Sequence, residues 1–257
     1  MYKYPILLYG FASRTLIELR RYPLNFLGTL ATYLMVFGLV FVGGRTIAPE
    51  GFESNVDAII VGYFLLTTVL ATFYTLSGLI NTEAKYGTLQ QLYVAPFPFP
   101  VVMLASVLAN LVVSIVISVV TLGFILVMTG ESLTIDLVTI VPVLGLTILH
   151  AIGVGFLLGG VALVYKRIRG MFSMLQFAFI GIISMALTDE FWPRLLPVGQ
   201  GAAMLHEAMA NGRGLLEFSL LDHAILASTT VVYVLIGYLS FHLAQHHARR
   251  RGLLDDY

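Results

Sequence analysis

Few residues of this chain have types and spacing that could carry out chemistry. Ser77, which precedes Gly78, and His150 are the one pair that could act as nucleophile and base in an intramembrane serine protease. Such a protease needs the pattern Gly-x-Ser-Gly, and Thr75 stands where its first glycine should be. The sequence therefore does not favour a protease.

Other catalytic and metal-binding patterns are missing from the sequence. The chain has no cysteine, which excludes disulfides, thiolate catalysis and cysteine-based zinc sites. It also lacks the Gly-x-x-x-x-Gly-Lys-[Ser/Thr] loop that holds nucleotide phosphates. We therefore predict no catalytic residue, no metal site and no cofactor in this chain. If the protein uses ATP, another chain must bind it.

The composition is that of a membrane protein. Of 257 residues, 58% are hydrophobic and 11% are charged, against about 25% charged residues in soluble domains, and the mean hydropathy is +0.92. This excludes an ordinary water-soluble enzyme. Because 14 Lys and Arg balance 14 Asp and Glu, no overall basic field favours a nucleic-acid partner.

Charge-free runs of the sequence predict six membrane-spanning helices. A bilayer core of roughly 30 Å needs about 20 apolar helical residues. The longest run, residues 86–130, is interrupted by the prolines between Pro96 and Pro100, so it holds one span that begins near Pro100. The predicted spans are residues 25–44, 58–81, 100–128, 138–164, 171–187 and 224–246.

The basic residues predict the orientation. With the N-terminus in the cytoplasm, eleven Lys and Arg residues fall in inner segments, while the outer ones hold Arg45, Arg194 and Arg213. Both termini should then be cytoplasmic. Residues 1–23, in which apolar and charged residues alternate, are expected to form a helix in the headgroup region. The alternative is a short disordered tail.

The spans carry few polar groups. None has a Lys, Arg, Asp or Glu near its centre, which disfavours ion coupling. His150 is the one ionisable residue near a helix centre, and we expect it to bond a neighbouring helix. Ala151, Gly155 and Gly159 repeat every four residues, as at close helix contacts.

Three threonines share one face of the second span. Thr68, Thr72 and Thr75 could line a translocation path with their hydroxyls. In the alternative interpretation, each hydroxyl bonds a carbonyl of its own helix, as membrane threonines commonly do.

The segment 81–100, NTEAKYGTLQQLYVAPFPFP, is the most informative part of the chain. Leu89, Leu92 and Tyr93 have helical spacing, which favours a short amphipathic helix on the cytoplasmic surface that ends at Pro96. Such a helix can transmit force to the two spans that it joins. The alternative is a plain interfacial loop.

This segment resembles the permease subunits of ABC-2 type ABC transporters. That family places a Glu near the end of its second span, followed by a Gly-Thr pair, a Leu and a Pro. Residues 19–23 also look like the family's passage from interfacial helix to first span, and the long loop 188–223 looks like its short outer re-entrant helices. The matching residues of the segment are Glu83, Gly87, Thr88, Leu92 and Pro96.

The resemblance implies one ABC-2 type transmembrane domain over residues 1–257. The expected fold class is an all-α membrane protein with six spans, an interfacial helix, a cytoplasmic coupling helix at residues 83–96 and short outer helices between spans five and six. Two permease chains, as a homodimer or heterodimer, would pair with two separate ABC ATPase subunits, which bind ATP and magnesium. Many relatives carry an acidic residue where this chain has Gln90 and Gln91, which bears on the charge of the ATPase contact.

The resemblance also suggests a path and a class of cargo. The family often lines its path with spans two and five, and Phe172 and Phe177 give the fifth span an apolar aromatic surface. An exporter of an amphiphilic drug, lipid or glycan in the plasma membrane would suit this surface. Plain helix packing or lipid contact is the alternative for these side chains. A membrane scaffold or assembly protein without transport activity, or an ion-independent channel, are the other candidate functions.

Overall fold

The computed structural model describes residues 3–85, 97–165, 169–187 and 190–250, and this part of the chain consists of helices and loops without strands. Two short 3-10 helices, η1 and η2, lie between α8 and α10. In chain order the helices are α1 (Lys3–Arg21), α2 (Pro23–Ile47), α3 (Pro49–Glu53), α4 (Val56–Lys85), α6 (Phe99–Thr129), α7 (Leu137–Tyr165), α8 (Arg169–Ala186), η1 (Trp192–Leu195), α9 (Gly199–Ala210), η2 (Leu215–Glu217) and α10 (Leu220–Arg250).

Five of the described helices are long and apolar enough to cross a membrane, where the sequence predicts six. The fifth predicted span corresponds to α8, whose apolar part, Ser173–Ala186, is shorter than the others. Its 18 residues give a helix of about 27 Å, slightly less than the bilayer core of about 30 Å. The five candidate spans are Pro23–Ile47, Val56–Thr75, Pro100–Thr129, Leu137–Ala162 and Leu220–His247.

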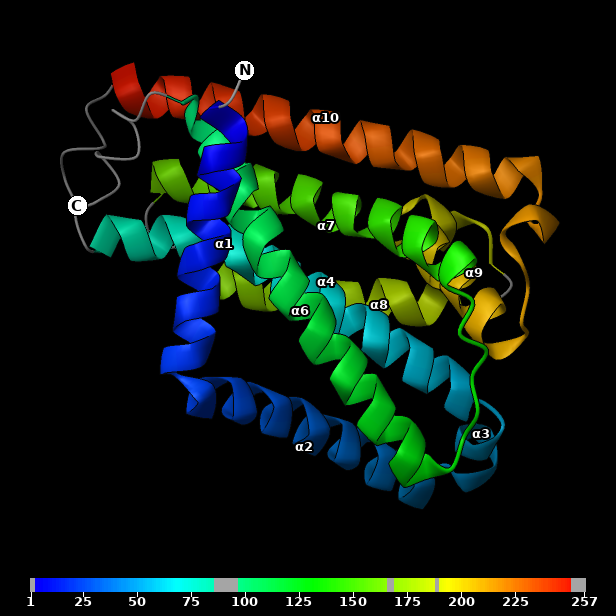
Figure 1. The fold of residues 1–257 in the computed structure, drawn as a ribbon. Helices are drawn as coiled ribbons and strands as arrows, with labels where there is room; N and C mark the ends of the chain where they lie inside the picture. Colours follow the sequence, from blue (N-terminus) through cyan, green and yellow to red (C-terminus); the bar gives the residue numbers. More distant parts are fainter. Residues whose placement is uncertain (1–2, 86–96, 166–168, 188–189, 251–257) are drawn as a thin grey trace.

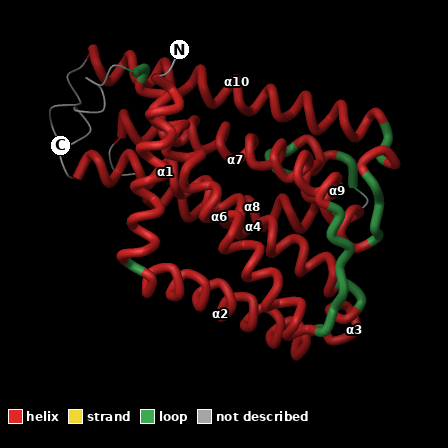
Figure 2. The backbone as a smooth tube through the Cα atoms, in the orientation of Figure 1, coloured by secondary structure: helices red, strands yellow, loops and turns green. Residues whose placement is uncertain are grey.

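The helices form a bundle with two different ends. In Figure 1, α2, α4, α7, α8 and α10 run in roughly the same direction, and α1 crosses them at the end where α10 finishes. Helices α3 and α9 lie at the opposite end, where most of the loops gather (Figure 2). The helix α1 thus lies across the direction of these helices, and its place at the membrane surface stays a prediction.

A short break separates α1 from α2. Tyr22 leaves the helix with φ −126° and ψ 58°, and Pro23 begins α2. Proline lacks an N–H and disfavours a helical conformation of the residue before it, but it suits the first turn of a helix. The sequence Tyr22-Pro23 therefore allows the chain to change direction between α1 and α2.

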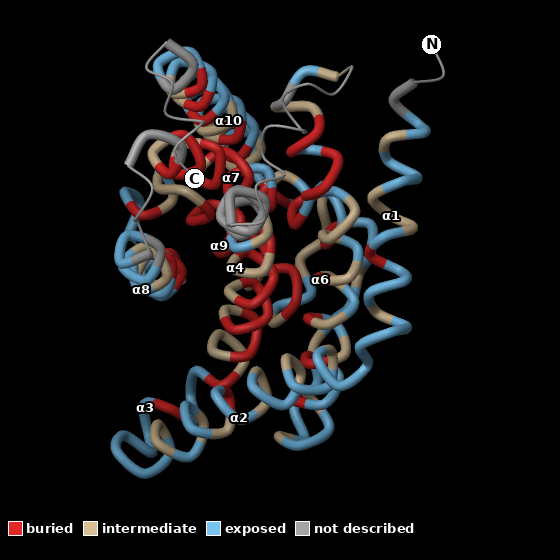
Figure 3. Tube along the Cα trace, turned by 90° about the vertical axis from the view of Figure 1, so that its left-hand side faces the viewer, coloured by how far each residue is buried: buried red, intermediate tan, exposed pale blue. Residues whose placement is uncertain are grey.

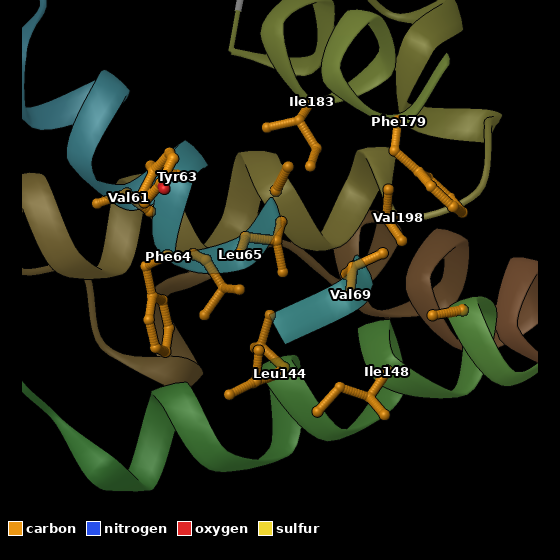
Figure 4. Close-up of a cluster of buried hydrophobic side chains, with 14 of the residues drawn as sticks. Val61, Tyr63, Phe64, Leu65, Val69, Leu144, Ile148, Phe179, Ile183 and Val198 are labelled. Carbon is orange, nitrogen blue, oxygen red and sulfur yellow. The ribbon is translucent and has the colours of Figure 1, made fainter. Parts of the chain in front are cut away.

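The core lies between α4 and its neighbours α7, α8 and α9. Leu65 and Val69 of α4 are completely buried and face Leu144 and Ile148 of α7 (Figure 4). By contrast, α1 and α2 are largely exposed (Figure 3). Apolar helix faces that no protein covers are expected to contact lipid or another chain.

Helices α7 and α10 have the most extensive contact in the bundle. A Cβ atom at Gly160 would lie 3.1 Å from the Cα of Phe241, so the two backbones approach closely there. Phe156 and Phe241 pack edge to face, with their ring centroids 5.3 Å apart. The small residues Ala151, Gly155 and Gly159, which suggest close packing of this helix, are buried.

Candidate functional site

The three threonines of α4 bond their own helix. The hydroxyls of Thr68, Thr72 and Thr75 donate to the carbonyls of Phe64, Thr68 and Ala71 at 2.8 to 2.9 Å. Thr68 and Thr72 are buried in the bundle, while Thr75 is partly buried. This geometry is that of the alternative interpretation, in which each hydroxyl donates a hydrogen bond to a backbone carbonyl of its own helix.

Helix α8 has one packed face and one exposed face. Phe179 is buried and meets Phe73 of α4 edge to face at 5.8 Å. Phe177 is 71% exposed and Met174 is 73% exposed, and their spacing of three residues places them on one face. Phe172 lies in the first turn of α8. The exposed face therefore presents a polarisable apolar surface beside α4.

A hydrogen bond connects the two helices next to this surface. The hydroxyl of Tyr74 on α4 donates to Oε1 of Gln176 on α8 at 2.9 Å. Both helices belong to the pair that we expect to line a path, and the bond holds them together at the level of Thr75. A polar bond of this kind resists separation of two helices in a lipid environment.

The expected coupling segment, residues 83–96, begins within the last turn of α4. The helix has 30 residues and is about 45 Å long, which exceeds the bilayer core of about 30 Å. Its last turn, with Glu83, can therefore extend beyond the hydrocarbon. Gly87, Thr88, Leu92 and Pro96 lie outside the described residues.

His150 contributes to helix packing. It is 1% exposed, and its Nε2 lies 3.0 Å from Oγ1 of Thr229 on α10. The Thr229 hydroxyl donates to the carbonyl of Ile225 at 2.6 Å, so it accepts from Nε2–H. Within the described part of the chain, no group of three or more His, Asp or Glu side chains is placed to hold a metal ion.

At the opposite end of the bundle, α9 forms a buried cap. Nine of its twelve residues are buried, and it contacts α4, α7, α8 and α10. A Cβ atom at Gly201 would overlap the hydroxyl of Thr147 on α7. Because only a glycine permits this approach, α9 can lie directly on α7. The resemblance implies short outer helices in the loop 188–223, and the structure has α9 there at Gly199–Ala210.

Polar side chains join this cap to α10. Gln200 is buried and donates from Nε2 to the Asp222 carboxylate at 3.1 Å. The same carboxylate accepts from the hydroxyl of Ser219 at 2.8 Å and lies 3.9 Å from the Arg194 guanidinium. Sequence reasoning did not identify this cluster, because Arg194, Gln200 and Asp222 come from three separate elements. The one local signal is the spacing of Ser219 and Asp222, which is typical of a helix start and does not indicate the other two residues.

An aspartate caps the first turn of α7. The Asp136 carboxylate accepts from the amide of Val138 at 3.0 Å and from the hydroxyl of Thr139 at 2.6 Å. These bonds stabilise the charged form and hold the pKa of Asp136 below its usual value. The cap fixes the start of the helix against which α9 packs.

Comparison with known proteins identifies a family that this chain matches. A family model described as ABC-2 type transporter matches residues 8–192, more than half of the chain. The match extends from α1 to the start of η1 and includes the segment 83–96. Neither the curated proteins nor the solved structures contain a match to the chain.

Proposed function

The chain belongs to the ABC-2 type transporter family, and from this membership we propose how it works within a complete transporter. As a member it is an integral membrane protein and a transmembrane permease of an ABC transporter. We propose that it pairs with a second permease chain, as a homodimer or a heterodimer, and with two copies of a separate ABC ATPase. The family match is the observation that carries this proposal.

Residues 83–96 are the proposed contact with the ATPase. Glu83 lies in the last turn of α4, a helix long enough to leave the hydrocarbon, and Leu92 would be the apolar anchor in a pocket of the partner. Gly87 would permit a tight turn, Thr88 would cap the short helix, and Pro96 would end it. ATP and magnesium would bind to the ATPase, whose closure would move α4 and α6.

We propose that α8 is the sixth crossing, which gives both termini a cytoplasmic location in the plasma membrane. The arrangement of α1 and the end of α10 at one end of the bundle supports this orientation (Figure 1). The excess of basic residues in the same segments supports it further. A helix slightly shorter than the bilayer core costs only fractions of a kcal/mol per Å of mismatch.

The proposed cargo is an amphiphile, such as a drug, a lipid or a glycan linked to a lipid, moved outwards. Phe177 and Met174 on the exposed face of α8 would contact its apolar part, with Phe172 at the start of the same helix. Thr75 is the threonine of α4 best placed for such contact, because Thr68 and Thr72 are buried. These two would reach cargo only after the helices move apart.

Purification of the complex tests the proposal. The chain should co-purify with an ATPase that carries the nucleotide loop, and the reconstituted complex should hydrolyse ATP faster in the presence of some members of a panel of amphiphiles. A scaffold would give no stimulation by any amphiphile. A channel would pass solute through vesicles that contain this chain alone, without ATP.

A further inference from the structure

Two adjoining cavities form a groove between α1, α2 and α6. One has a volume of about 560 Å³ and the other about 380 Å³, which is within the range of about 300 to 1,000 Å³ for ligand sites. They share four lining residues, so they are two halves of one groove. The shared residues are Thr15, Leu19, Phe26 and Val113.

The larger half, which we call the polar half, has polar side chains beside five apolar or aromatic ones. Glu18, Asn25, Thr29 and Asn110 line it together with Thr15. The Asn110 amide donates from Nδ2 to the carbonyl of Ser106 at 3.0 Å, which orients its Oδ1 as an acceptor. Glu18 is the one charged residue in this lining. This half therefore offers fixed acceptors and a negative charge.

The positive partner of Glu18 lies beside the groove. Nε of Arg14 is 3.0 Å from Oε1 of Glu18, one helical turn earlier on α1, and both side chains are more than half exposed. The pair presents a negative and a positive charge side by side at the polar half. A zwitterionic group has the complementary arrangement of charges.

The smaller half is apolar. It continues along α1 past Leu8, Ala12 and Leu16 and along α6 past Leu108, Val112 and Val116. Val112 and Leu16 are both more than half exposed, at 64% and 54%. An apolar groove of this kind is poorly filled by water, but it can take a hydrocarbon chain.

The groove lies between α1 and two candidate membrane spans, α2 and α6. Helix α1 runs across the end of the bundle beside α6, apart from the core (Figures 1 and 3). The polar half lies at the corner where α1 turns into α2, and the apolar half extends away from that corner along α1. An amphiphile with a compact charged head matches this order.

We propose that this groove is a binding site for one phospholipid with a primary-amine headgroup. The ammonium group binds Glu18 and Oδ1 of Asn110, the phosphate binds Arg14, and one acyl chain lies between α1 and α6. A choline headgroup has no N–H to donate, and a glycerol headgroup has no positive charge, so both fit less well. The lipid stays bound between α1 and α6 and stabilises their packing.

Native mass spectrometry of the purified permease tests this site. The protein is exchanged into equal mixtures of phosphatidylethanolamine with phosphatidylcholine or with phosphatidylglycerol, and the retained lipids are counted. We expect one phosphatidylethanolamine per chain, with at least tenfold preference over either competitor. Glu18→Gln should reduce this preference to nearly one, and Val113→Trp, which fills the shared part of the groove, should reduce retention of all three lipids.

Two control variants carry the same kinds of substitution away from the groove, so they show whether loss of an ion pair or an added tryptophan by itself changes lipid retention. Glu53→Gln breaks the exposed pair with Arg45, whose atoms are 3.5 Å apart, and Val127→Trp adds a tryptophan to an exposed position of α6. Both should retain lipid like the wild type. If Val113→Trp does not fold, Leu16→Trp on the exposed α1 makes the same test.

Three results would overturn the site. They are equal retention of the three lipids by the wild type, unchanged preference in Glu18→Gln, and cross-linking of two chains through cysteines at Val112, which would assign the groove to a second copy. The measurement uses neither ATP nor an ATPase. Failure of the proposed transport function would therefore leave the lipid result unaffected. Failure of the lipid site would likewise leave the transport function untouched.

Discussion

The carbonyl oxygen of Gly153 on α7 occupies the place that a Cβ atom would take at residue 237 on α10. Gly237 is therefore one of the points at which the two helices touch backbone to backbone. Such contacts lengthen the surface that two helices share, and in a bilayer packing of this kind drives helix association. The α7–α10 pair is a closely packed unit within the bundle.

Gly237→Ala should loosen this unit. The added methyl group has no space, so the helices must separate, at a cost of about 1 to 3 kcal/mol of stability. Thermal unfolding of the purified protein in detergent measures the loss. Gly145→Ala is the matched control on α7, because a Cβ at Gly145 meets nothing within 4 Å. Equal unfolding temperatures for the two variants would contradict the contact.

Gly201→Ala should displace α9 from α7. The new methyl group would overlap the Thr147 side chain, so the variant should unfold at a lower temperature. The same change made in a Thr147→Gly background should cost much less, because the overlapping atoms are gone. A double-mutant cycle measures the difference. Additive effects of the two changes would mean that the residues do not meet.

His150 should support packing and not transport chemistry. His150→Ala and Thr229→Val should each destabilise the protein, with a coupling energy of about 0.6 kcal/mol, the average for hydrogen bonds between membrane helices. His150→Gln, which can still donate to Thr229, should keep ATP-dependent transport close to that of the wild type. A proton-coupled role would instead abolish transport in this variant, and transport by the wild type would then follow an imposed pH gradient.

Leu92→Asp should separate the permease from its ATPase. A charge in place of the apolar anchor cannot enter a hydrophobic pocket without a large desolvation cost, so co-purification and transport should both be lost. Membrane insertion, measured by fractionation, should be unchanged, because the residue lies outside the predicted spans. Leu92→Met, which keeps an apolar side chain of similar volume at the same position, is the control and should retain both co-purification and transport. Normal transport by Leu92→Asp would refute the coupling role.

Phe177→Ala should change which amphiphiles stimulate ATP hydrolysis. The side chain is 71% exposed on α8, so its removal costs little stability but removes a large apolar contact from the proposed path. Stimulation curves for a panel of amphiphiles check this. Phe124→Ala on α6, where the ring is 50% exposed, should leave the curves unchanged. Identical curves for all three proteins would exclude Phe177 from the path.

The sequence by itself determined that this is a helical membrane protein, and five of its six predicted spans coincide with helices long and apolar enough to cross a bilayer. Transfer of a segment into lipid depends on its own run of apolar residues, so residues 100–128 could be identified as a span without knowledge of any neighbour. The break at Tyr22-Pro23 is equally local, because proline restricts the residue before it. The resemblance carried by residues 83–96 agrees with the family match over residues 8–192.

Only the tertiary structure decided which faces are covered and which side chains meet. Thr68 and Phe177 look equally suited to a path in the sequence, yet one is completely buried and the other is 71% exposed. Gly153 meets Gly237, and Gln200 meets Asp222, from different helices. Hydrophobicity alone does not specify such pairs, because in a bilayer every face of an apolar helix is acceptable to lipid. The matching of shapes and hydrogen bonds between helices selects among them.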